Sequence, residues 1–64
     1  MKVDTKTDLF KNGASVSFEK SFPYGLYTVT IRAPDGCTHR RIRTDDYQAA
    51  LEYQGAFRAI AKNL

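Results

Sequence analysis

Cys37 and His39 are the two side chains of this 64-residue sequence that could combine in nucleophilic chemistry. They stand two positions apart, and on a β-strand that spacing places both side chains on one face within about 7 Å of each other. Nothing in the pattern supplies a third, orienting group or an oxyanion site. Because each residue occurs once in the chain, two ligands at most could reach a metal ion. We therefore expect no enzymatic activity, no metal and no other cofactor.

Asp45 and Asp46 form a pair of carboxylates that could in principle exchange protons. They also stand where a helix is expected to begin. Carboxylates in a first helical turn cap free N–H groups and oppose the positive end of the helix dipole. We therefore interpret both as structural residues.

Arginine, threonine and serine side chains recur with a period of two and form the pattern best suited to binding. Guanidinium groups bind phosphates or the O6 and N7 atoms of guanine, and hydroxyl groups bond to either kind of partner. If the strand phases below hold, one face of a sheet carries Ser15, Ser17, Thr28, Thr30, Arg32, His39, Arg41 and Arg43, with Glu19 as its acid. Such residues are also ordinary on the solvated face of an antiparallel sheet, so both interpretations stay open.

Three segments have the alternation of half-buried strands. In residues 14–20, Val16 and Phe18 point to one side. Residues 26–33 place Tyr27, Val29 and Ile31 inward, and Pro34-Asp35-Gly36 predicts a tight turn. Residues 37–44 then place Ile42 inward together with Thr38 and Arg40, whereas Cys37, His39, Arg41 and Arg43 face outward.

Apolar residues that include Ala50, Phe57 and Ala61 recur at helical spacings and predict a helix from Asp45 to about Lys62, with Thr44 or Asp45 as its N-cap. Gly55 falls within it and suggests a kink or a close approach to the sheet, because glycine is costly inside a helix. The fold class is therefore α+β: a three-stranded antiparallel β-meander packed on one C-terminal helix (βββα).

The first thirteen residues give a weaker signal. Residues 1–7 have little apolar content and predict a loosely ordered N-terminus. Asp8 to Gly13 has two interpretations: Asn12-Gly13 is typical of a type I′ hairpin turn, but the segment also fits one helical turn.

Length and composition bound the function further. Sixty-four residues form one small domain with a modest core, so stability must come from packing, a partner or homodimerisation. A single cysteine indicates a reducing compartment, and the sequence shows no apolar membrane span and no signal peptide, so we expect a cytoplasmic protein. The net charge of +3 favours an acidic partner such as nucleic acid.

A family resemblance rests on four segments taken in order: Gly25 to Ile31, Asp35-Gly36, Arg41 to Thr44, and Asp45 to Ala50. They resemble the three-stranded-sheet DNA-binding domains, which are the arm-binding domain of phage and transposon tyrosine integrases and the related plant AP2-type domain. The resemblance covers about residues 25–64. It implies that the sheet face away from the helix enters the major groove of duplex DNA. By position, the contacts would fall to Thr28, Thr30, Arg32, Arg41 and Arg43.

A protein partner is the alternative to DNA. In size the chain is also similar to small accessory proteins of phages and prophages, many of which bind host proteins. Phe22 and Tyr24 flank a proline and are suited to anchor such a contact or to inhibit a host protein. Self-association through the sheet, or through Tyr53 and Ile60 on one flank of the helix, is a third route.

Overall fold

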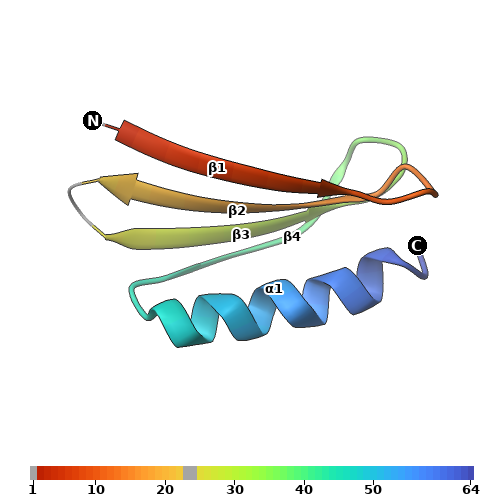
Figure 1. The fold of residues 1–64 in the computed structure, drawn as a ribbon. Coiled ribbons are helices and arrows are strands. Elements are labelled where there is room, and N and C mark those ends of the chain that lie inside the picture. Colours follow the sequence, from red (N-terminus) through yellow and green to blue (C-terminus); the bar gives the residue numbers. More distant parts are fainter. Residues whose placement is uncertain (1, 23–24) are drawn as a thin grey trace.

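Four β-strands and one helix follow each other along the chain in the computed structural model, which describes residues 2–22 and 25–64 (Figure 1). The elements are β1 (Lys2–Leu9), β2 (Ser15–Phe22), β3 (Leu26–Arg32), β4 (Thr38–Thr44) and α1 (Tyr47–Ala61). The strands form one antiparallel sheet in the order β1-β2-β3-β4, so each strand pairs with its neighbour in sequence. The α+β class and the C-terminal helix are as predicted.

The number of strands was predicted wrongly, because β1 is a fourth strand. It occupies the segment for which the sequence predicted little order. β1 pairs with β2 over its whole length, from Lys2 opposite Phe22 to Leu9 opposite Ser15. Its helix-facing positions Asp4, Lys6 and Asp8 are charged, so the strand has none of the apolar alternation that marks the other three. Backbone pairing with β2 therefore forms this strand without burying an apolar face of its own.

The β1–β2 connection is a hairpin, not a helical turn. The Phe10 N–H donates to the Ala14 carbonyl at 2.9 Å, and the Gly13 N–H donates to the Phe10 carbonyl at 3.0 Å. Gly13 has φ of 93°, whereas no described non-glycine residue has a positive φ. A type I′ turn needs positive φ at both central residues, so the predicted hairpin is present without the predicted turn type.

The core lies between the sheet and α1. Val16, Val29 and Ile31 are fully buried from the sheet side, as the strand alternation predicted. Phe57 is buried from the helix side, where Ala50 and Ala61 allow close packing. Towards the start of α1 the core continues as three contacting rings, Phe18, Tyr27 and Tyr47, with centroids 5.3–6.3 Å apart.

Helix α1 begins slightly later than predicted. Asp46 is its N-cap, and its carboxylate accepts from the N–H groups of Gln48 at 2.9 Å and Ala49 at 3.4 Å. Thr44 accepts instead from the Asp46 N–H at 3.1 Å. Gly55 neither interrupts the helix nor approaches the sheet, since a Cβ placed there has open space around it. The predicted close approach at Gly55 is therefore wrong, and the helix continues through this residue to Ala61.

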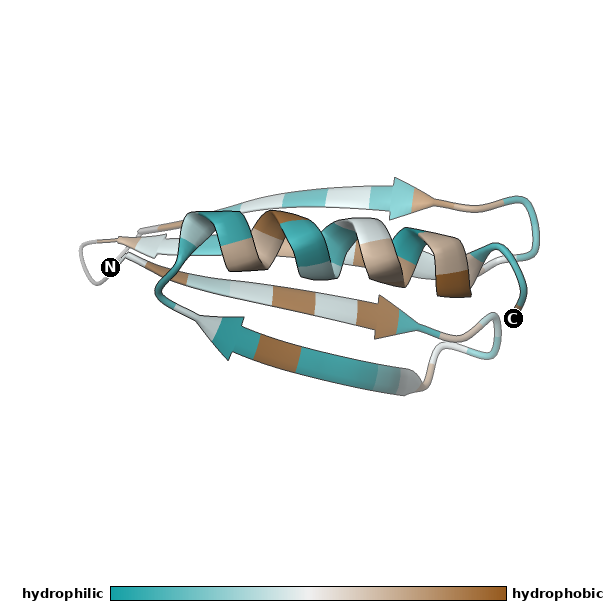
Figure 2. Cartoon of the chain, turned by 90° about the horizontal axis from the view of Figure 1, so that it is seen from below, coloured by the Kyte–Doolittle hydropathy of each residue, from teal (hydrophilic) through white to brown (hydrophobic). Residues whose placement is uncertain are grey.

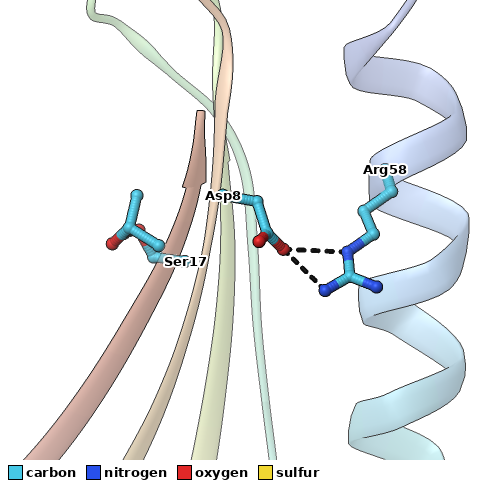
Figure 3. A network of polar contacts seen from close by, with 4 residues as sticks. Asp8, Ser17 and Arg58 are labelled. Carbon is cyan, nitrogen blue, oxygen red and sulfur yellow. Dashed lines mark hydrogen bonds and ion pairs between the residues drawn. The ribbon is translucent and has the colours of Figure 1, made fainter. Parts of the chain in front are cut away.

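The helix covers only part of the sheet. It packs on β2, β3 and β4, and in Figure 2 β1 lies beyond one side of the helix. One side-chain contact bridges the gap: Arg58 of α1 donates from Nε to the Asp8 Oδ2 at 2.9 Å, with Nη2 2.6 Å from the same oxygen. Figure 3 shows this contact, with Asp8 directed towards the helix and Ser17 on the other side of the sheet. β1 is thus an edge strand that the helix leaves largely uncovered.

Candidate functional site

The side of the sheet away from α1, called here the outer face, carries the residues singled out from the sequence. Pairing between β2, β3 and β4 arranges them in cross-strand rows. One row is Ser17, Thr30 and Arg41; a second is Glu19, Thr28 and Arg43. Since cross-strand partners have Cβ atoms about 5 Å apart, each arginine stands beside a threonine of the neighbouring strand.

Thr30 is only 3% exposed although it lies on the outer face. Its hydroxyl accepts a hydrogen bond from Nε of Arg41 at 3.4 Å. The guanidinium of Arg41 still presents its two terminal nitrogens, because this bond uses only Nε. Thr30 is therefore placed to position Arg41 and has no surface left for a ligand contact of its own.

Arg41, Arg43 and Arg32 are all exposed on the outer face. Among the described side chains, none of these three guanidinium groups forms an ion pair. Glu19 is half-buried on β2, and Thr28 of β3 stands between it and Arg43. The outer face near β4 is therefore cationic and its charge is not neutralised within the described part of the chain.

β4 contains an irregularity that changes the predicted phase at its start. Arg40 pairs with Ile31 on the helix side, as predicted, but the register then shifts and Arg32 pairs with Thr38. His39 is the extra residue between these pairs and is exposed. Thr38, predicted to point inward with Ile42, instead pairs at the level of an outer-face residue. A bulge of this kind cannot be read from alternation, because it breaks the alternation.

The residues considered for catalysis lie just before β4, within β4 and just before α1. Cys37 is exposed, outside β4, and its N–H donates to the Asp35 carboxylate at 3.0 Å. Among the residues described, no three His, Cys, Asp or Glu side chains come together. The Asp46 carboxylate is engaged as the helix cap.

The residues proposed for a protein contact are only partly described. Phe22 is half-buried at the end of β2, and Nζ of Lys20 lies 4.8 Å from the centroid of its ring. Tyr24 lies outside the described residues.

A groove on the helix side was not predicted from the sequence. Its volume is about 620 Å³, and its lining comes from β1, β2, β3 and α1: Asp4, Lys6, Phe18, Lys20, Tyr27, Tyr47, Leu51, Gln54 and Arg58. Sequence reasoning missed it because β1, which forms one wall, was not predicted as a strand. The sequence signal that could have predicted this strand is the charge at alternate positions of residues 4–8.

Comparisons of the chain with protein-family models, with curated proteins and with solved structures find no significant match. In the described part of the chain no helix is both long and apolar enough to cross a membrane. The function must therefore be argued from the geometry of the outer face and of the sheet edges.

Proposed function

We propose that this protein is a small non-enzymatic DNA-binding protein that contacts duplex DNA through the outer face of its sheet, in a bacterial cytoplasm. The observation that carries the proposal is the pair Arg41 and Arg43, two exposed guanidinium groups at alternate positions of β4 with no described acidic partner. Arg32, Thr28 and His39 lie around them on β3 and at the bulge. This arrangement suits phosphate contacts together with donation to guanine in the groove.

Duplex DNA fits the outer face better than single strands do. The outer-face positions of the four strands hold no aromatic residue, whereas proteins that bind single strands stack bases on aromatic rings. Two adjacent strands such as β3 and β4 match the width of the major groove, about 12 Å. The free edge of β4 lets that ribbon approach DNA without obstruction from α1, which lies on the opposite side of the sheet.

The test replaces Arg41 and Arg43 together by alanine and measures binding to a mixed-sequence duplex by fluorescence anisotropy. We expect the affinity to fall by about tenfold or more at low salt, because two phosphate or base contacts are lost. The slope of log affinity against log salt should also become shallower by about two units.

Arg40→Ala is the matched control, because Arg40 is exposed on the same strand but pairs with Ile31 on the helix side. Removing one positive charge from any position lowers the affinity for DNA somewhat. Apart from that general effect, Arg40→Ala should change the affinity by less than about twofold. An equal loss from Arg40→Ala and from Arg41→Ala alone would show that overall charge, and not the outer face, drives binding.

A protein partner is the competing outcome. In a pull-down from bacterial lysate, nuclease treatment should release the captured material if DNA holds it. Retention of one protein after nuclease treatment, with no measurable binding to purified duplex, would reject the proposed function.

A further inference from the structure

The free edge of β1 is the feature of the fold that the proposed function leaves unused. β1 is the terminal strand of the sheet, and within residues 2–22 and 25–64 its backbone pairs only with β2. α1 packs on the other three strands and leaves most of β1 uncovered, apart from the contact between Arg58 and Asp8. An unpaired strand edge of this length is a template for another strand, and proteins usually block such an edge.

The side chains of β1 do not block every partner. On the helix-facing side they alternate in sign, with Asp4, Lys6 and Asp8 in sequence. On the outer side they are β-formers, including Val3, which is 49% exposed, and Thr5. Among the side chains that the structure describes, Asp8 is bound by Arg58, but neither Asp4 nor Lys6 forms an ion pair.

A second copy of the chain fits this pattern in one register. Symmetric antiparallel pairing of β1 with itself needs a twofold axis perpendicular to the sheet, so residues on the same face stand opposite each other. With the axis at Thr5, Asp4 faces Lys6 of the second copy, and Lys6 faces its Asp4. Opposite charges directly across two strands stabilise pairing.

The neighbouring registers are unfavourable or short. An axis at Asp4 places that carboxylate against its own copy, and an axis at Lys6 places two ammonium groups together and Asp4 against Asp8. An axis at Thr7 pairs Lys6 with Asp8 but shortens the contact to Thr5–Leu9 and uses a carboxylate that Arg58 already binds. Only the axis at Thr5 satisfies Asp4 and Lys6 and uses nearly the whole strand.

We infer that the chain forms a twofold dimer in which two β1 strands pair about Thr5, joining two four-stranded sheets into one continuous sheet. Both helices lie on the same side of this sheet, and the helix-side grooves meet at the dimer seam because β1 forms one wall of each. On the outer face, Val3 stands opposite Thr7 of the second copy.

The other sheet edge explains why association stops at a dimer. β4 carries Arg40, Arg41 and Arg43 and no acidic residue. Two β4 strands brought together would face like charges, which destabilise cross-strand pairing. The sheet therefore has one edge that accepts a copy of itself and one that rejects it.

Charge reversal on β1 tests the register by sedimentation, without DNA, so the result is independent of the proposed function. The unaltered chain, of 7.2 kDa, should sediment as a monomer–dimer equilibrium at concentrations of about 10–500 µM, within the range of weak interfaces. Asp4→Lys and Lys6→Asp each turn both attractive pairs into repulsive ones and should weaken the dimer about tenfold or more.

Mixing the two single variants gives the decisive result. In the mixed pair the ammonium group introduced by Asp4→Lys faces the carboxylate introduced by Lys6→Asp, and the native Lys6 of one chain faces the native Asp4 of the other. Two weakly associating variants should therefore form a heterodimer, and the double variant D4K/K6D should regain self-association. Recovery on mixing also shows that both variants remain folded. A chain that stays monomeric at the highest concentration, or a dimer that neither single variant weakens, would overturn the inference.

Discussion

Arg41 differs from the other arginines of the outer face because its guanidinium is hydrogen-bonded to a neighbouring side chain. The hydroxyl of Thr30 accepts from its Nε, and Thr30 itself is buried. A guanidinium held at one nitrogen loses less rotational freedom on binding a phosphate or a base, because part of that cost is already met in the free protein. Arg43 pairs with Thr28 in the next row and forms no hydrogen bond with the Thr28 side chain.

Replacing Thr30 with valine isolates this effect. The side chain keeps its β-branched shape, and Arg41 keeps its charge but loses its acceptor. We expect the affinity for duplex DNA to fall by about two- to fivefold, equivalent to one net hydrogen bond, while the stability changes by less than about 1 kcal/mol.

The salt dependence separates positioning from charge in this variant. The slope of log affinity against log salt should be the same as that of the unaltered protein, because no charge is removed. An unchanged affinity would show that Arg41 does not need Thr30, and a shallower slope would show that a phosphate contact has been lost instead.

The sequence predicted which residues lie on the outer face but not how exposed each of them is. Alternation assigned Thr28, Thr30 and Arg41 to one face, and the registers agree. Alternation could not show that Thr30 would be covered. The burial of a residue on a central strand depends on the way in which the long side chains beside it lie over it. The bulge at His39 was not predicted either, because an inserted residue cannot be recognised from the alternation of a strand.

At the scale of elements, β1 and the loop after it decide how the helix is held. Asn12 lies in the β1–β2 loop, and its Nδ2 donates to the carbonyls of Ala61 at 2.7 Å and Leu64 at 3.1 Å. Its Oδ1 accepts from the Ala14 N–H at 2.9 Å. One side chain therefore orders the hairpin loop and also bonds to the last residue of α1 and to Leu64, which follows the helix.

Asn12→Ala should therefore cost more than a surface substitution normally does. We expect a loss of about 1–3 kcal/mol, the sum of three modest hydrogen bonds. For a domain of this size that corresponds to a fall of roughly 7–22 °C in the melting temperature, measured by circular dichroism.

Asn63→Ala is the control for Asn12→Ala. Its Nδ2 donates to the Ala59 carbonyl within the same end of the helix and bridges no second element. That variant should lie within about 0.5 kcal/mol of the unaltered protein, as exposed substitutions generally do. Equal shifts in the two variants would mean that the loop does not hold the helix.

Elements with an apolar period were predictable, and the element without one was not. The spacing of Ala50, Phe57 and Ala61 predicted the helix, and Val29 and Ile31 predicted β3, because each set faces the core. The polar segment that forms β1 buries little, so the hydrophobic signal used to find strands is missing. Its charges and β-formers nevertheless alternate with the period of a strand.

At the scale of the whole molecule, the proposed dimer places two outer faces on one side of a single sheet. Seven strand spacings of about 4.8 Å separate the two β4 strands, and five separate the two β3 strands, which gives roughly 24–34 Å before twist shortens it. Dimeric DNA-binding proteins use half-sites one helical turn apart, about 34 Å. One dimer could therefore contact two successive turns of the same groove.

Duplex length provides the last test. A duplex of about 20 bp admits both outer faces of the dimer, and one of about 8 bp admits one, so the unaltered protein should bind the longer duplex more than tenfold tighter. The increase should be largely absent for Asp4→Lys and Lys6→Asp separately. Their net charges of +5 and +1 bracket the +3 of the unaltered chain, since each change shifts the charge by two.

The double variant D4K/K6D keeps the net charge at +3 and restores the cross-strand pairs, so it should regain the dependence on length. If sedimentation shows a dimer but the affinity does not depend on length, the two outer faces do not act on one duplex. If the dependence persists in both single variants, it arises without β1 pairing. β1 pairing contributes to DNA binding only if the dependence of affinity on duplex length follows dimerisation. It must be lost in both single variants, whose net charges lie above and below the native value, and return in the double variant.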